Sequence, residues 1–308
     1  MSYRRLKETW VNNTLMENYS KPKKFLGLIT RCKDEFFVKE FTDYYLSQGV
    51  DIIYLLDDNS NDKSIYDNIT DNRVVIKYEK QIVHPKDWKG MKVVNNLYNK
   101  IKHEFEWIIF VDVDEFITTK KNFNKTIRHE LKTTFKDFDY VRIPWVLMSS
   151  NLDRNPKSIL DSIVYRRSQD IRHKNITDDN HRKWECTYEL ILCKYIIRTD
   201  KIGNLETHEG VHFSTKHSPI IADGVKAQEI KVGTQDLRYH PKLREKDIKD
   251  SYLICHHYRI ISKENSINKV RHNKWYNRQK FDVDKIMKAY LPEVKDETLK
   301  IKKNKLNF

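Results

Sequence analysis

The stretch WIIFVDVDEF, Trp107–Phe116, joins an apolar run directly to an acidic cluster. Its first five residues are all apolar, which predicts a strand that is buried on both faces. Asp112 and Asp114 follow at once, and alternate residues of an extended segment point to the same side. The sequence therefore predicts a buried strand that ends in two carboxylates facing one place.

The residues before this stretch show further strand patterns. Apolar runs at 25–29 (FLGLI), 51–56 (DIIYLL) and 74–76 predict three more buried strands. Between them, apolar residues recur at helical spacing over 37–48 and again from 91 to 101. Strand–helix–strand alternation of this kind predicts an α/β fold, with a Rossmann-like, mostly parallel central sheet flanked by helices.

The second half of the chain has weaker patterns. We expect strands at 140–143, 189–197 and 252–254 and a helix at 267–276. No composition change marks a boundary, so one extended domain is expected over residues 25–290.

Two terminal segments flank the expected domain. Residues 1–24 are expected to be an N-terminal extension, and 291–308 a basic tail, solvated and frayed. Its basic residues are Lys300, Lys302, Lys303 and Lys305.

The composition limits the function classes. With 39% hydrophobic and 12% aromatic residues, the chain is expected to be folded rather than disordered. The net charge of +14 favours a phosphate-bearing partner such as a nucleotide, nucleic acid or an anionic membrane. The start shows no apolar signal segment and no run of 18 apolar residues occurs, so we expect a soluble, cytoplasmic protein.

The two aspartates of the quoted stretch are candidate metal ligands. Hard cations such as Mn²⁺ and Mg²⁺ take oxygen ligands and often bind through one or two carboxylates plus substrate phosphates. Asp112 and Asp114 are therefore expected to hold such an ion, which would neutralise a diphosphate leaving group. The alternative is that both side chains belong to a solvated turn.

Other polar residues stand where strands are expected to end, and ligands of such sheets bind at the carboxyl ends of the strands. Asp57 and Asp58 are candidates for contacts with a nucleotide, although aspartates also favour turns on their own. Thr30 and Arg31 close the first strand, and Arg suits phosphate recognition. Lys89 opens the helix before the acidic stretch and is a further donor-binding candidate; the alternative for both basic residues is an ordinary surface side chain.

His256 and His257 are adjacent in the sequence. In an extended segment they point to opposite faces, so one of them at most can enter a given site. A neutral imidazole is a suitable third ligand for Mn²⁺. A structural histidine is the alternative for either residue.

Three segments together resemble a known family. They are LITRCKDEFFVKEFTDYYLSQGVDIIYLLDDNSND (28–62), WIIFVDVDEF (107–116) and HHYRIISKENSINKV (256–270). They resemble the family 2-like and family 92-like glycosyltransferases, a group often labelled domain of unknown function 23. The most specific mark is DVDEF, and His257-Tyr258-Arg259 match a late HYR motif.

The resemblance implies a GT-A fold and a glycosyltransferase of the hexosyltransferase type. It further implies a nucleotide-sugar donor, with a UDP-sugar as the first expectation, a glycan or glycoprotein acceptor, and inversion at the anomeric carbon. Asp112, Asp114 and His257 would be the ligands of Mn²⁺ or Mg²⁺. The family often has Gln where Lys89 stands, which is a departure from its pattern.

An inverting transferase also needs a general base near the acceptor hydroxyl. Glu209, beside His208 and His212, is the first candidate, and Asp153 and Glu206 are others. Each of these carboxylates is also compatible with an ordinary surface position.

Two other functions remain open at this stage. A metal-dependent nucleic-acid enzyme would use the positive charge and the same aspartates, but the sequence has no basic stripe beyond its end and no recognisable binding motif. A non-catalytic sugar-binding module could keep the same fold, against which the intact acidic cluster argues. We expect no sequence-specific binding of nucleic acid.

Overall fold

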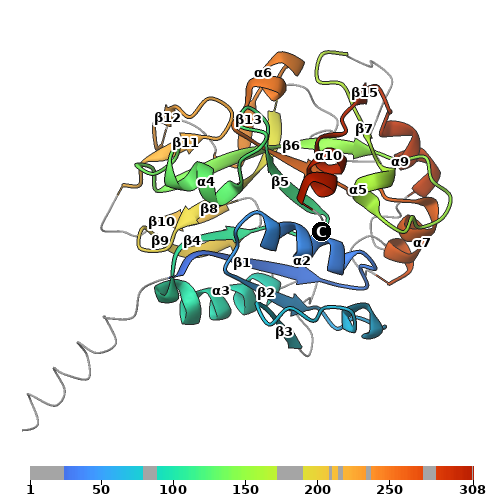
Figure 1. The fold of residues 1–308 in the computed structure, drawn as a ribbon, viewed down its shortest axis with the longest axis horizontal. Coiled ribbons are helices and arrows are strands. Elements are labelled where there is room, and N and C mark those ends of the chain that lie inside the picture. Colours follow the sequence, from blue (N-terminus) through green and yellow to red (C-terminus); the bar gives the residue numbers. More distant parts are fainter. Residues whose placement is uncertain are drawn as a thin grey trace, which may run out of the picture.

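The computed structural model describes residues 24–78, 89–171, 190–207, 210–213, 218–233, 237–272, 282–306 and 308 (Figure 1). The expected N-terminal extension, apart from its last residue, lies outside them.

Strands and helices alternate in the first part of the described chain, and short strands follow one another in the later part. The strands are β1 (Lys24–Cys32), β2 (Ile52–Asp57), β3 (Val74–Tyr78), β4 (Phe105–Phe110), β5 (Glu115–Thr119), β6 (Tyr140–Ser149), β7 (Tyr165–Arg166), β8 (Leu190–Arg198), β9 (Ile202–Thr207), β10 (Gly210–Phe213), β11 (Ile221–Asp223), β12 (Glu229–Ile230), β13 (Tyr239–Pro241), β14 (Leu253–His257) and β15 (Val294–Lys295). The α-helices are α2 (Val38–Ser47), α3 (Lys89–Ile101), α4 (Ile127–Lys132), α5 (Ile159–Ser162), α6 (Glu245–Asp250), α7 (Lys263–His272), α9 (Val283–Ala289) and α10 (Thr298–Leu306), and 3₁₀ turns cover Ser64–Tyr66 and Lys102–Glu104.

One large sheet organises the molecule, with its main strands in the order β12-β11-β6-β8-β4-β1-β2-β3. Strands β3, β2, β1 and β4 run parallel to one another, as the sequence predicts. Strand β8 then enters antiparallel between β4 and β6. The α/β fold with a Rossmann-like sheet is confirmed, and its parallel part is the half that carries the acidic stretch.

Helices cover both faces of the parallel part, and α2 and α3 lie on opposite sides of it in Figure 1. The side of α2 that carries Phe41 and Tyr45 packs with Leu28 and Ile109. The side of α3 that carries Val94 packs with residues one position further along these strands, such as Ile29. The period of two along each strand therefore supplies two separate cores.

Gly49 makes the turn from α2 into β2. Its φ of +89° lies in the left-handed region, where a side chain is strained. A Cβ at this position would also lie 2.7 Å from the Cβ of Arg128. The helix that the spacing over 37–48 predicts therefore ends at a position where only glycine fits.

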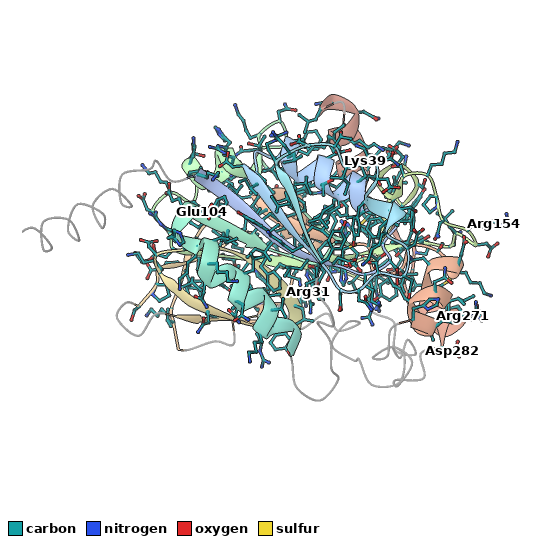
Figure 2. All side chains as sticks on the ribbon, turned by 90° about the horizontal axis from the view of Figure 1, so that it is seen from below. Arg31, Lys39, Glu104, Arg154, Arg271 and Asp282 are labelled. Atoms are coloured by element: carbon teal, nitrogen blue, oxygen red, sulfur yellow. The ribbon has the colours of Figure 1, made fainter. Side chains whose placement is uncertain are left out.

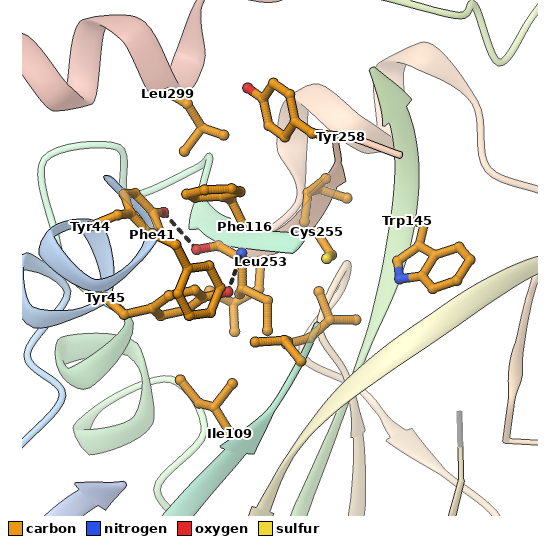
Figure 3. Close-up of a cluster of buried hydrophobic side chains, with 14 of the residues drawn as sticks. Phe41, Tyr44, Tyr45, Ile109, Phe116, Trp145, Leu253, Cys255, Tyr258 and Leu299 are labelled. Atoms are coloured by element: carbon orange, nitrogen blue, oxygen red, sulfur yellow. Dashed lines mark hydrogen bonds between the residues drawn. The ribbon is translucent and has the colours of Figure 1, made fainter. Parts of the chain in front are cut away.

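Phe116 anchors the end of the acidic stretch inside the main core (Figure 3). Its ring centroid lies 5.3 to 5.6 Å from those of Phe41, Tyr44 and Tyr258. The Tyr44 hydroxyl donates to the carbonyl oxygen of Ile117 at 2.6 Å. Because both the ring and the backbone of β5 are fixed, the acidic residues just before them have a defined position.

Strand β14 extends this arrangement from late in the chain. It runs antiparallel to β5 and parallel to the second half of β6, with Cys255 opposite Trp145. Strand β6 accordingly continues past Pro144 to Ser149, further than the residues 140–143 expected from the sequence. The expected helix at 267–276 begins earlier, at Lys263, and residues 273–281 lie outside the described residues.

The end of the chain differs from the solvated, frayed tail that its lysines suggest. Residues 298–306 form α10, in which Leu299 and Lys302 are buried. Lys303 lies 2.9 Å from Glu40 and 2.6 Å from Asp161. The expectation of a frayed tail is wrong because Leu299 packs into the main core and Lys303 pairs with carboxylates from distant parts of the chain.

None of the helices within the described residues is long and apolar enough to cross a membrane.

Candidate active site at the end of β4

The carboxyl ends of β1 and β4 bring the first expected site residues together. Ile29 pairs with Phe110, so Arg31 and Asp112 leave the sheet side by side. The Arg31 Nη2 donates to Asp112 Oδ1 at 3.0 Å. Burial alone would lower the pKa of Arg31, but Asp112 outweighs it and the pKa is raised. In Figure 2, Arg31 is labelled near the middle of the view, whereas Arg154 and Asp282 are labelled towards one side of it.

Asp112 also meets a lysine that the sequence analysis missed. Lys194, in the middle of β8, places its Nζ 3.2 Å from Asp112 Oδ2 and 2.9 Å from Glu115 Oε2. The same Glu115 oxygen accepts the backbone N–H of Asp112 at 2.8 Å. Lys194 is fully buried, which would lower its pKa, but the two carboxylates outweigh burial and raise it. Its signal in the sequence is one charged residue inside the apolar run LILCKYII.

Asp114, the second aspartate, has a different set of neighbours. Its Oδ2 accepts from Lys269 Nζ of α7 at 3.3 Å, and its Oδ1 lies 3.7 Å from His257 Nε2. Burial would raise the pKa of Asp114, but Lys269 and His257 outweigh it, so the pKa is lowered and the side chain is ionised at neutral pH. Lys269 also lies 3.0 Å from Glu35, in the loop after β1.

The two adjacent histidines of β14 face opposite sides, as the alternation predicts. His257 turns to Asp114 and packs its ring 4.4 Å from that of Trp145. Burial lowers the pKa of His257 to about 4, so its imidazole is neutral at pH 7. His256 turns the other way, where its Nε2 lies 3.3 Å from Asp296.

The predicted residues at the end of β2 serve the loop that follows it. Asp57 is buried, and it accepts hydrogen bonds from the Tyr66 hydroxyl at 2.6 Å and from the backbone N–H of Ser60 at 3.2 Å. Its neighbour Asp58 is partly exposed, and its backbone N–H donates to the carbonyl oxygen of Cys32 at 2.7 Å. Asp57 therefore shapes this loop, and a donor contact for either aspartate stays a prediction.

Thr30 is fully buried one residue before Arg31, and its hydroxyl donates to the Arg31 carbonyl oxygen at 3.5 Å. The structure thus places Thr30 beneath the site, and its expected donor contact stays a prediction. Lys89 is the first residue of α3, but its side chain lies outside what the structure describes.

Of the three candidates for the general base, the structure describes the side chain of Asp153 alone. Asp153 is exposed, and its carbonyl oxygen accepts the N–H of Glu264 in the first turn of α7 at 3.0 Å. Glu209 and His208 lie outside the described residues. Glu206 and His212 lie on β9 and β10, with side chains that are not described. The identity of the base therefore stays a prediction.

The expected metal ligands converge in part. No group of three or more His, Cys, Asp and Glu side chains suited to a metal ion occurs within the described ranges. Asp114 Oδ1 and His257 Nε2 do form a pair, and their 3.7 Å separation is too long for a hydrogen bond. The buried Nδ1 of His257 also has no hydrogen-bond partner in the described part of the chain. An ionised carboxylate and a neutral imidazole are suitable donors for Mn²⁺, so this pair fits the ion, with Asp112 beside it engaged by Arg31 and Lys194.

No protein-family model matches this chain, and no curated protein matches it. Two solved structures are similar to it. The crystal structure of HddC from Yersinia pseudotuberculosis has 14% sequence identity and a TM-score of 0.33, covering 65% of this chain and 89% of that chain. The 4-diphosphocytidyl-2C-methyl-D-erythritolsynthase from Anaerococcus prevotii DSM 20548 has 10% identity and a TM-score of 0.29, covering 57% and 71%. Likenesses of this size leave the function to be argued from the side chains of this chain.

Proposed function

We propose that this protein is a metal-dependent glycosyltransferase of the GT-A type that uses a nucleotide-sugar donor, with a UDP-sugar as the first candidate. The observation that supports it best is Asp114, ionised and set between His257 and Lys269 just beyond the end of β4. Ligands of such sheets bind at this end of the strands. The DVDEF segment that carries Asp114 is also the most specific part of the resemblance to glycosyltransferases.

The charges of the cluster support a need for a cation. Four carboxylates face three cationic side chains: Glu35, Asp112, Asp114 and Glu115 against Arg31, Lys194 and Lys269. Burial raises the pKa of Glu115 to about 8 and also raises that of Glu35, and His257 is neutral, so at neutral pH the cluster offers at most a small surplus of positive charge to a diphosphate. A divalent ion held by Asp114 and His257 would add to that surplus and stabilise the diphosphate as it leaves the sugar.

The chain's own residues would divide the remaining work. Arg31, near the end of β1 and bonded to Asp112, has a planar guanidinium group suited to a phosphate oxygen. Lys194 and Glu115 fix the orientation of Asp112 from below, because both are buried and bonded to it. The acceptor, a glycan or glycoprotein, would attack the anomeric carbon from the side opposite the leaving diphosphate, with Glu209 or Asp153 as the candidate that takes the hydroxyl proton.

Thermal unfolding in the presence of candidate donors tests the proposal. A ligand that binds only the folded protein raises the melting temperature. We expect a nucleotide sugar to raise it with Mn²⁺ present and to do so much less in excess chelator, and we expect Asp114→Asn to remove the metal-dependent part. A panel of UDP-, GDP- and CMP-sugars that gives no shift with either metal would contradict the proposal.

A further inference from the structure

Lys269 occupies the place beside Asp114 that a bound ion and its diphosphate need. It projects from α7, and its Nζ lies 3.3 Å from Asp114 Oδ2 and 3.0 Å from Glu35 Oε1. The side chains of Lys269 and Asp114 are each 14% exposed, so this bridge is largely shielded from solvent. A surface lysine on a helix would not be held between two shielded carboxylates.

A divalent ion on Asp114 would drive this ammonium away. Like charges at this separation repel strongly in a shielded site, where the effective dielectric constant is well below that of water, and the second charge of the ion doubles the repulsion. Lys269 and the ion therefore compete for Asp114. The removal of the positive charge of Lys269 should strengthen metal binding, which is the opposite of what the loss of a ligand or of a structural residue would do.

Glu35 keeps Lys269 close to the site after that displacement. It lies in the loop after β1, so its contact with Lys269 does not depend on Asp114. Its second oxygen, Oε2, is buried and finds no hydrogen-bond partner within the described segments. An ammonium group tethered by Glu35 still has N–H donors to offer, and the negative group that would arrive with the ion is the diphosphate of the donor.

We propose that Lys269 is a diphosphate-binding residue, which pairs with Asp114 before the metal ion binds and moves to a donor phosphate afterwards. This inference rests on the proposed function, because it takes the ion and the diphosphate from it. It adds a named phosphate ligand and an order of events: Lys269 first neutralises the Asp114 carboxylate and then the diphosphate of the donor.

Binding of Mn²⁺ alone and of pyrophosphate with saturating Mn²⁺ tests the exchange. Calorimetry would be done on the wild type and on Lys269→Met, which keeps the length of the side chain and removes its charge. We expect the Kd for Mn²⁺ to fall by about tenfold and the Kd for pyrophosphate to rise by about tenfold, as for one charged interaction gained or lost. Lys269→Arg should retain most of the pyrophosphate affinity.

Lys263→Met is the matched control, since it makes the same substitution on the same helix. Lys263 is 43% exposed and pairs with Asp284 at the surface, so neither Kd should change. A second variant guards against misfolding of Lys269→Met: Glu35→Gln leaves the ammonium to Asp114 alone and should weaken Mn²⁺ binding, and the double variant Glu35→Gln/Lys269→Met should reverse that loss.

Opposite changes in the two constants support the exchange. If both affinities fall together in Lys269→Met, or if Mn²⁺ affinity stays the same, Lys269 does not compete with the ion and the inference is wrong while the proposed function stands. If the wild type binds neither Mn²⁺ nor pyrophosphate, the proposed function itself fails, and this inference fails with it.

Discussion

His256 and His257 are neighbours on one strand, yet they belong to two different clusters of charge. His257 faces Asp114, whose other partner is Lys269, at a distance too long for a hydrogen bond, while Nδ1 of each histidine is without a hydrogen bond among the described residues. His256 faces Asp296, and there the carboxylate also bonds Arg166 at 2.9 Å and Lys120 at 3.1 Å.

The Asp296 cluster is built to hold the fold. Asp296 comes from the segment just before α10, and its partners come from β7, from β14 and from the residue that follows β5. Arg166 also pairs with Glu245 of α6 at 2.6 Å. Burial would raise the pKa of Asp296, but His256 and Lys120 outweigh it and lower the pKa well below its usual range. A buried carboxylate with this many fixed partners joins elements, whereas the Asp114 cluster keeps capacity for a ligand.

Asp114→Asn gives the largest expected effect. The substitution keeps the shape and the backbone bond to Tyr258 but removes the charge that an ion needs, so transfer should fall by on the order of 1000-fold, or about 4 kcal/mol in activation free energy. Donor turnover would be measured with the nucleotide sugar found by thermal shift. Asp71→Asn, at an exposed pair with Arg73, is the control and should keep full activity. If Asp114→Asn turns over the donor as fast as the wild type, the Asp114 cluster is not the metal site, and the functional difference between the two clusters is lost.

Asp296→Asn should mainly affect stability. It leaves the buried Arg166 and Lys120 with one carboxylate fewer, which should lower the free energy of unfolding by about 3 kcal/mol. Urea unfolding measures the change. Glu297→Gln alters the adjacent surface pair with Lys295 and should change stability by less than about 1 kcal/mol. A loss below that level in Asp296→Asn would show that the cluster does not hold the fold.

The two histidines can be compared directly by alanine substitution. His257→Ala removes a donor next to Asp114, so the Mn²⁺ concentration for half-maximal activity should rise about tenfold, the order expected for weakened metal binding. His256→Ala should leave that titration unchanged and lower the melting temperature instead, because its ring is buried against Asp296. A larger metal defect in His256→Ala would reverse the two roles, and an unchanged titration in both would move the third ligand to His208 or His212.

The smallest expected effect concerns Lys302, a buried lysine whose hydrogen-bond acceptors are uncharged. Its Nζ donates to the Lys125 carbonyl oxygen at 3.2 Å and to the Thr118 and Thr119 hydroxyls, and burial lowers its pKa to about 7, opposed by Glu130. The buried Lys194 meets two carboxylates, and its pKa is raised instead.

The pH dependence follows from where the proton is held. Between pH 7 and the ordinary lysine pKa near 10.4, the unfolded chain holds a proton that folded Lys302 has released, so stability from this group rises with pH. Lys302→Met removes this group, so it should raise the free energy of unfolding by about 1 kcal/mol more at pH 7 than at pH 8. Urea unfolding at both pH values measures the difference, and equal changes at the two would mean that Lys302 stays charged in the fold.

Local pattern was enough to predict the first half of the fold. Apolar runs and helical spacing predict β1, α2, β2, α3 and β4, because the buried side chains of a strand or a helix recur at a spacing that is visible within that element alone. The same pattern places Arg31 and Asp112 at strand ends, since parallel strands end at one edge. It also predicts that His256 and His257 separate, because side chains alternate along any strand.

Only the tertiary structure decided which charges meet. Lys194 reaches Asp112 across 82 positions of the chain, and Lys269 reaches Asp114 across 155. Such contacts depend on an antiparallel β8 beside β4 and on β14 beside β5, which no local period encodes. For the same reason the lysines of α10 are typical of a solvated tail in the sequence, although Lys302 is buried in the structure. The sequence determines which charge a side chain can carry, and its distant neighbours determine whether that charge is exposed, paired or buried.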